Sequence, residues 1–129
     1  MKKTFLIFGS LFGLLAVVLG AFGAHALGKL IDAAKIATFE TGVRYQMYHA
    51  LLMLFLSTSK IFSDKVLRVL RFLIITGIVL FSGSIYFLAT NSLTSFDFKT
   101  FGFITPIGGT LLITAWAIIL IKSMGSNKE

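Results

Sequence analysis

The side chains of this sequence that could carry chemistry gather on one short stretch before its middle. They are Glu40, Arg44, Tyr45, Tyr48 and His49. In a helix, which turns by about 100° per residue, all of them except Glu40 fall within an arc of roughly 140°, and Glu40 lies just beyond it. An arginine beside tyrosine hydroxyls can hold an anion, such as a phosphate, through charge-assisted hydrogen bonds. The pattern therefore indicates a ligand-binding face for a small anion or a lipid headgroup.

Simpler interpretations of the same residues stay open. Glu40 and Arg44 are four residues apart, so they could form an ordinary helix-surface ion pair worth roughly 0.3–0.5 kcal/mol. His25 and His49 have no carboxylate at helical spacing, which favours hydrogen-bonded histidines at helix contacts over a metal site. The sequence also lacks a carboxylate pair and a nucleophile with a nearby base. We therefore predict no catalytic residue, no metal and no other cofactor, and a protein that is not an enzyme.

Four long apolar runs must position these side chains. Residues 4–24, 41–59, 72–96 and 100–121 contain no Asp, Glu or Lys, and their only arginine is Arg44. A helix needs roughly 20 such residues to cross about 30 Å of hydrocarbon. The runs predict an all-α membrane protein, a four-transmembrane-helix bundle that forms a single domain over residues 1–129. We place the spans at residues 4–25, 39–59, 68–91 and 102–122.

The composition excludes other classes of protein. Hydrophobic residues make up 57% of the chain and charged residues 13%, which is too little charged surface for an ordinary soluble domain. The absence of cysteine excludes disulfides, thiol catalysis and cysteine metal sites. A net charge of +7 could indicate nucleic acid. The basic residues lie at the ends of the apolar runs, however, so we expect membrane lipids as partners and no nucleic acid.

The twelve lysines and arginines also predict an orientation. If the chain crosses four times, eight of them fall on one side: Lys2, Lys3, Lys60, Lys65, Arg68, Arg71, Lys122 and Lys128. The other side receives Lys29, Lys35, Arg44 and Lys99. Because basic residues near span ends are retained in the cytoplasm, both termini should be cytoplasmic. Anionic headgroups of the plasma membrane should then contact the cytoplasmic face.

This topology places further polar residues near the candidate binding face. His25 ends the first span, and Tyr86 lies in the outer half of the third. We expect His25, Arg44, Tyr48, His49 and Tyr86 at one level of the bundle, in its extracytoplasmic half. The charged and apolar mixture at residues 29–38 reads either as a short interfacial helix between the first two spans or as an extension of the second.

Small residues recur at helical spacing in the first span. Gly9, Gly13, Gly20 and Gly23 are separated by three, four or seven residues, so they share one face along which another helix can approach closely in lipid. A signal peptide is a rival interpretation of this segment, but the apolar stretch of about 20 residues exceeds the 7–15 typical of a signal core. We expect a retained helix packed within the chain, with a homo-oligomer as the open alternative. Gly83, Gly108 and Gly109 are the expected packing glycines of the later spans.

Four segments resemble a known family. They are residues 20–27 (GAFGAHAL), 45–51 (YQMYHAL), 81–86 (FSGSIY) and 104–109 (ITPIGG), followed by Trp116. In this order and spacing they resemble an uncharacterised family of small four-span bacterial inner-membrane proteins, which has small eukaryotic transmembrane relatives. The resemblance implies four helices and a plasma-membrane location, and it brings no activity.

Two functional hypotheses remain. The first is a non-enzymatic membrane protein that binds a lipid headgroup or small anion, or that supports membrane integrity. The alternative is a small transporter or proton-conducting oligomer in which His49 titrates within the membrane. The absence of broken helices in pairs and of a chain of acidic residues disfavours the alternative.

Overall fold

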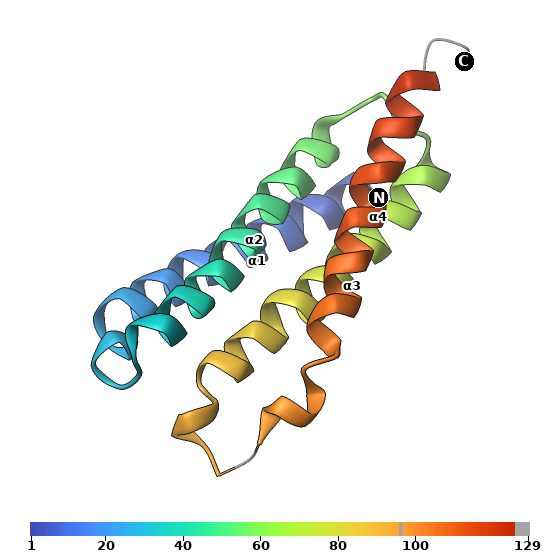
Figure 1. Cartoon of the computed structure of the whole chain (residues 1–129). Coiled ribbons are helices and arrows are strands. Elements are labelled where there is room, and N and C mark those ends of the chain that lie inside the picture. The colour runs from blue at the N-terminus through green and yellow to red at the C-terminus, as the bar shows by residue number, and fades with distance from the viewer. Residues whose placement is uncertain (96, 126–129) are drawn as a thin grey trace.

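The structure, a computed structural model, describes residues 1–95 and 97–125, and its regular elements there are all helices. The described residues form four long α-helices, which are labelled in Figure 1. Their bounds are α1 (Lys2–His25), α2 (Ala33–Thr58), α3 (Asp64–Ala89) and α4 (Ile104–Gly125). Three 3₁₀ turns lie in the connections: η1 (Leu27–Lys29), η2 (Asn91–Leu93) and η3 (Phe98–Phe101). The predicted all-α bundle is confirmed.

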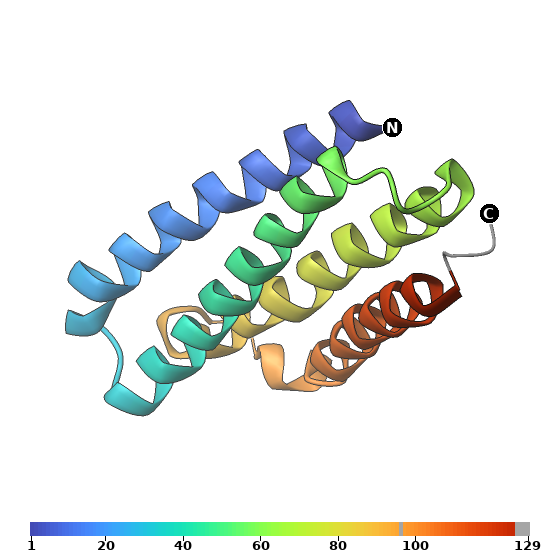
Figure 2. The ribbon, with the colours of Figure 1, turned by 90° about the horizontal axis from the view of Figure 1, so that it is seen from above.

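Each helix runs antiparallel to the next one in the chain. α1 packs on α2, α2 on α3 and α3 on α4, as the view from above shows (Figure 2). The start of α1, the end of α2, the start of α3 and the end of α4 therefore share one end of the bundle, which we call the terminal end. The other end, which carries the α1–α2 and α3–α4 connections, is the distal end.

Three segments of the described chain are long and apolar enough to cross a membrane: Lys2–Lys29, Asp64–Ala89 and Phe98–Gly125. Their outward faces are apolar even at mid-helix, where Ile113 is 71% exposed and Leu14 62%. Contiguous apolar surface of this kind marks a face that is covered, here by lipid. α2 is long enough to cross, at about 1.5 Å per residue, but Lys35, Glu40 and Arg44 make its first half less apolar.

Helix caps explain where α2 and α3 begin. The Asp32 carboxylate accepts a hydrogen bond from the backbone N–H of Lys35 at 2.9 Å and starts α2 at Ala33. The Ser63 hydroxyl accepts one from the N–H of Val66 and starts α3 at Asp64. Both helices thus begin earlier than the expected spans at residues 39 and 68. Of the two interpretations of residues 29–38, most of this segment extends α2, and only η1 stands between α1 and α2.

The larger part of the core lies toward the terminal end. Phe5, Met53, Leu70 and Ile74 are fully buried there, and Ala115 joins them, so all four helices contribute. A smaller cluster at the distal end consists of Leu27, Phe39 and Ala89. The buried polar side chains of the helices, Gln46, His49 and Ser82, lie in the interior between the two clusters.

Glycines allow the closest helix contacts. A Cβ on Gly9 would lie 2.9 Å from the Leu54 side chain, and one on Gly23 would lie 3.0 Å from Phe39. A Cβ on Gly108 would collide with the backbone of Phe81 in α3. The remaining expected glycines make looser contacts: Gly13, Gly20 and Gly109.

Gly83 requires a correction, because it faces open space. A Cβ built on it would meet no atom within 4 Å, so it contributes no close helix packing in the described chain. Two glycines that we did not expect do so instead. A Cβ on Gly42 would lie 2.8 Å from the Tyr86 ring, and one on Gly77 would lie 2.6 Å from Leu112.

Candidate functional site

A buried hydrogen-bond network joins α1, α2 and α3, and Gln46 is its centre. The Gln46 amide nitrogen donates to the backbone carbonyl of Phe12 in α1 at 2.8 Å. Its amide oxygen accepts from the Tyr86 hydroxyl of α3 at 2.6 Å. Gln46 is only 4% exposed, so one buried side chain ties together three helices.

His49 connects α2 to α4. The indole N–H of Trp116 donates to His49 Nε2 at 3.0 Å, and His49 Nδ1 lies 2.6 Å from the backbone carbonyl of Tyr45. Because the indole can only donate, Nε2 must accept, and Nδ1 must carry the proton that it shares with the carbonyl. Both nitrogens of His49 are therefore engaged inside the protein, with the ring buried at 3% exposure.

Serine hydroxyls complete the buried polar contacts. Ser82 donates to the backbone carbonyl of Gly42 at 2.7 Å and joins α3 to α2. Ser84 lies 2.6 Å from the Thr105 hydroxyl and joins α3 to α4. Among the residues that the structure describes, no buried side-chain nitrogen or oxygen lacks a partner. The interior network is thus internally satisfied, as a structural lock between helices must be.

The opposite edge of the polar arc on α2 is exposed. Arg44, Tyr45 and Tyr48 all lie on the surface, and the two tyrosine rings pack edge to face with centroids 5.7 Å apart. Tyr45 also packs edge to face against Phe81 of α3 at 5.2 Å. We call Arg44, Tyr45 and Tyr48 the exposed polar face. The structure thus separates this face from two inward-facing members of the expected site, the buried His49 and the half-buried Tyr86.

Arg44 is the charged member of the exposed polar face. Its guanidinium donates to the Thr41 hydroxyl of the preceding turn at 3.2 Å. Within the described residues, no ion pair joins it to Glu40 or to another carboxylate. Glu40 is exposed on the same helix. The remaining guanidinium donors of Arg44 therefore face the surroundings of α2, where an anion could accept their hydrogen bonds.

His25 is the expected site residue that the structure sets apart. It ends α1 at the distal end, where Gly23 lies against Phe39. His49 lies near the level at which Ala50 meets Gly13. Twelve residues of α1 separate Gly13 from His25, or roughly 18 Å of helix rise. The expectation that His25 and His49 share one level is therefore wrong, and the two histidines are too far apart to bind one metal ion.

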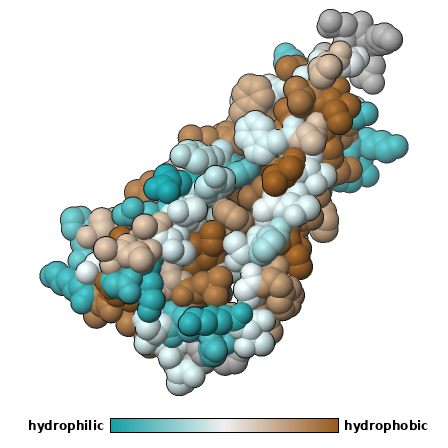
Figure 3. Space-filling view, viewed as in Figure 1, coloured by the Kyte–Doolittle hydropathy of each residue, from teal (hydrophilic) through white to brown (hydrophobic). Residues whose placement is uncertain are grey.

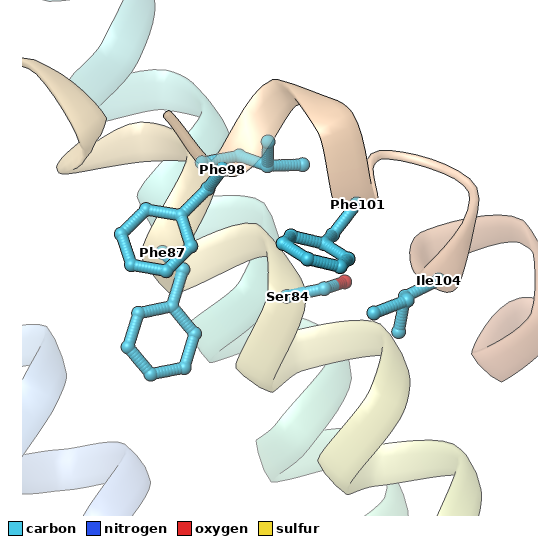
Figure 4. Close-up of a pocket in the computed structure, with 6 residues that line it drawn as sticks. Ser84, Phe87, Phe98, Phe101 and Ile104 are labelled. Atoms are coloured by element: carbon cyan, nitrogen blue, oxygen red, sulfur yellow. The ribbon is translucent and has the colours of Figure 1, made fainter. Parts of the chain in front are cut away.

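A pocket of about 320 Å³ opens at the distal end between α3, η3 and the start of α4 (Figure 4). Its walls include Phe87, Phe98, Phe101 and Ile104. Among the described residues of its lining, Ser84 is the only polar side chain, and it already bonds Thr105. None of the expected site residues lines this pocket. It is apolar space between packed elements, separate from the exposed polar face.

The space-filling view relates these features to the surface. Hydrophilic residues gather most densely at the distal end, and others lie near the terminal end (Figure 3). On the face shown, hydrophobic residues and residues of intermediate hydropathy cover most of the surface between them. This distribution is typical of a protein whose polar ends meet the headgroup regions and whose middle meets acyl chains.

Sequence reasoning missed Gln46, Ser82 and Trp116 as members of the interior network. Gln46 carried a usable signal, because it lies about 60° around the helix from His49, on the side that also holds Gly42 and Phe39. A lone amide at the centre of a buried face must find partners. Trp116 carried no such signal, because its contact with His49 depends on how α4 rotates against α2.

The chain is similar to membrane proteins of bacteria. Residues 19–109 match the family described as "Protein of unknown function (DUF423)". The chain is 39% identical to the UPF0382 membrane protein YwdK of Bacillus subtilis, with 95% of the chain and 97% of that protein covered. It is 36% identical to the UPF0382 inner membrane protein YgdD of Escherichia coli K12, with 99% and 95% covered. No solved structure matches.

Proposed function

Because the chain belongs to the DUF423 family, whose relatives above are named only as membrane proteins, we propose that it is a non-enzymatic protein of the plasma membrane. It crosses the membrane four times, with both termini in the cytoplasm, and binds the phosphate of a lipid headgroup, or a small anion of the same chemistry, on its exposed polar face. No relative named above carries the name of an enzyme.

The antiparallel order of the helices supports four crossings. α1 and α3 are both apolar enough to span, and they run in the same direction on either side of α2. If both span, the chain must return across the membrane between them, and α2 is the segment that connects them. The eight-to-four division of basic residues supports a cytoplasmic position for the terminal end.

The depth of Arg44 supports binding of a lipid phosphate. About 30 Å of hydrocarbon corresponds to roughly 20 helical residues. Counted back from Thr58, the end of α2, these residues reach about Phe39. Arg44 then lies about 7 Å below the distal membrane surface. A long arginine side chain extends toward the headgroups from such a depth, so its guanidinium can reach a lipid phosphate.

The single observation that carries the proposal is the unpaired charge of Arg44 beside two exposed tyrosines. A cation within a membrane span is unfavourable unless it finds an anion or polar partner. Glu40 makes no ion pair with it, whereas a phosphate can accept two parallel hydrogen bonds from a guanidinium. Tyr45 and Tyr48 place hydroxyl donors on the same face.

The alternative, a transporter or proton-conducting oligomer that uses His49, has less support. Both ring nitrogens of His49 already bond Tyr45 and Trp116. Toward the terminal end, the interior continues as the apolar core cluster around Met53 and Ile74. A proton would find no chain of polar groups through that cluster.

The test compares Arg44→Gln with Lys99→Gln, which removes an exposed distal cation outside the four α-helices. The proteins are purified in mild detergent, and native mass spectrometry counts the phospholipids that each retains. We expect Arg44→Gln to lose a bound phospholipid that the wild type and Lys99→Gln keep. Titration with inorganic phosphate separates the two sources of anion, because displacement of the lipid by free phosphate would identify a small-anion site. Equal lipid retention by all three proteins, with no binding of inorganic phosphate, would overturn the proposal.

A further inference from the structure

A groove of about 630 Å³ lies at the terminal end, at the opposite end of the bundle from Arg44. It is bounded by the α2–α3 connection, the first turns of α3 and the last turns of α4. Its lining combines apolar walls with two cations: Val66, Val69, Ile118, Ile121, Lys65 and Lys122. The volume falls within the range of roughly 300–1,000 Å³ that is typical of small-molecule sites.

The polar and apolar parts of the groove are separated along the helices. Lys65 lies in the first turn of α3, and Lys122 lies in the last turn of α4, so both charges stand where the helices leave the membrane. Val69 and Ile118 lie one turn deeper. The groove therefore presents cations at headgroup depth and an apolar trough at the depth of acyl chains.

The charge around the groove favours an anionic occupant. The described residues from Ser59 to Arg71 contain four cations and one acid, Asp64, which leaves a net charge of +3. The apolar walls remain exposed, with Val69 at 46% and Ile121 at 65%. An amphiphile with one anionic head and acyl chains matches both parts of the groove. A soluble anion would leave the trough uncovered, and an apolar helix would leave the lysines unpaired.

We propose that this groove binds one anionic phospholipid of the cytoplasmic leaflet, with its phosphate between Lys65 and Lys122 and an acyl chain against Val69 and Ile121. The site is independent of the exposed polar face of α2. The two lie at opposite ends of the bundle and use different cations, so either can fail without the other.

The test measures binding of phosphatidylglycerol and of phosphatidylcholine with the same acyl chains to the detergent-purified protein, by native mass spectrometry. The double variant Lys65→Gln/Lys122→Gln removes both groove cations. Lys2→Gln/Lys3→Gln is the matched control, because it removes two exposed terminal-end cations that do not line the groove. A third variant, Val69→Trp, keeps both lysines and fills the apolar trough.

We expect the wild type to bind one phosphatidylglycerol more tightly than phosphatidylcholine. The groove pair should raise the dissociation constant for phosphatidylglycerol about 30-fold, roughly fivefold for each lysine near an anionic group, while the control pair changes it little. Val69→Trp should also weaken binding, although the charge is unchanged.

Several results would overturn the inference. Equal loss in the two lysine pairs would assign binding to general positive charge at this end. Unchanged binding in Lys65→Gln/Lys122→Gln would show that the phosphate does not contact these lysines. Unchanged binding in Val69→Trp would show that the acyl chain does not lie in the trough. Competition by soluble glycerol phosphate as strong as that by the lipid would show that the trough contributes nothing. A dimer that Val69→Trp dissociates would identify a second copy of the chain as the occupant.

Discussion

Gln46 connects three helices with one side chain, through hydrogen bonds to one group of α1 and one group of α3. The Tyr86 hydroxyl and the Phe12 carbonyl both face the interior between α1, α2 and α3. Without the buried amide of Gln46, each of these two groups would lose a hydrogen-bond partner. The network around Gln46 should therefore contribute to stability, whereas the exposed polar face on the same helix should contribute to binding.

The substitution Gln46→Leu tests the structural role of this residue. Leucine has a similar size, so the packing of the helices is kept while both interhelical hydrogen bonds are lost. We expect the free energy of unfolding in detergent to fall by roughly 1–2 kcal/mol, the upper range for interhelical hydrogen bonds in membranes. Thermal unfolding followed by circular dichroism measures the change.

Tyr48→Phe is the matched control, because it removes an exposed hydroxyl from the same helix. It should leave stability nearly unchanged. Gln46→Leu combined with Tyr86→Phe should destabilise less than the sum of the single changes, since the two residues share one hydrogen bond. Additive losses would contradict a direct contact between Gln46 and Tyr86.

The sequence predicted only in part which polar residues of α2 are exposed and which are buried. The 100° rotation placed Arg44, Tyr45 and Tyr48 together, and the structure leaves all three exposed. His49 falls at the edge of the same arc, and the structure buries it. Periodicity gives the angle of each side chain around a helix. It does not say which of these angles face neighbouring helices and which face lipid. That division is set by the rotation of each helix against the others.

At the scale of elements, α3 and α4 approach each other closely at Gly108. A Cβ at this position would collide with the backbone of Leu80 and Phe81, which cannot rotate away as a side chain can. The same approach continues at Gly77, which faces Leu112 of α4. Close packing of this kind drives helix association in lipid, because lipid tails are as apolar as the side chains and the hydrophobic effect does not favour contact between helices.

Gly108→Ala should therefore destabilise the bundle by about 1–3 kcal/mol, the usual cost of overpacking a core. Gly83→Ala provides the control on α3, because its methyl group would enter open space. It should preserve or slightly raise stability, since alanine favours the helix by up to about 1 kcal/mol over glycine. Melting temperatures of the two variants in the same detergent measure the difference. Equal melting temperatures would show that α3 and α4 do not meet at Gly108.

The four elements themselves could be predicted from apolar runs, but their ends could not. The start of α2 lies at Ala33 and not near residue 39, because Asp32 caps the helix upstream of the apolar run. Ser63 does the same for α3. Hydropathy marks where a helix can meet lipid, whereas caps mark where the backbone hydrogen bonds begin, and the two differ wherever a helix extends beyond the membrane.

At the scale of the whole molecule, the account depends on α2 crossing the membrane. Among the long helices of the described residues, α2 alone is not apolar enough to count as a span by composition. Its position between α1 and α3 nevertheless requires it to return across the bilayer if they span. Both binding proposals assume this crossing, because in the proposed orientation it puts Arg44 in the distal half of the membrane and the lysine-lined groove in the cytoplasmic half.

Single-cysteine labelling tests this crossing most directly, because the natural chain contains no cysteine. Gly28→Cys and Ser63→Cys place exposed thiols before and after α2, and Ser92→Cys places one between α3 and α4. A membrane-impermeant maleimide is added to intact cells or spheroplasts, and then to permeabilised ones. The account predicts that Gly28→Cys and Ser92→Cys react in intact cells, and that Ser63→Cys reacts only after permeabilisation. Reaction of Gly28→Cys and Ser63→Cys from the same side would contradict it, because α2 would then not cross.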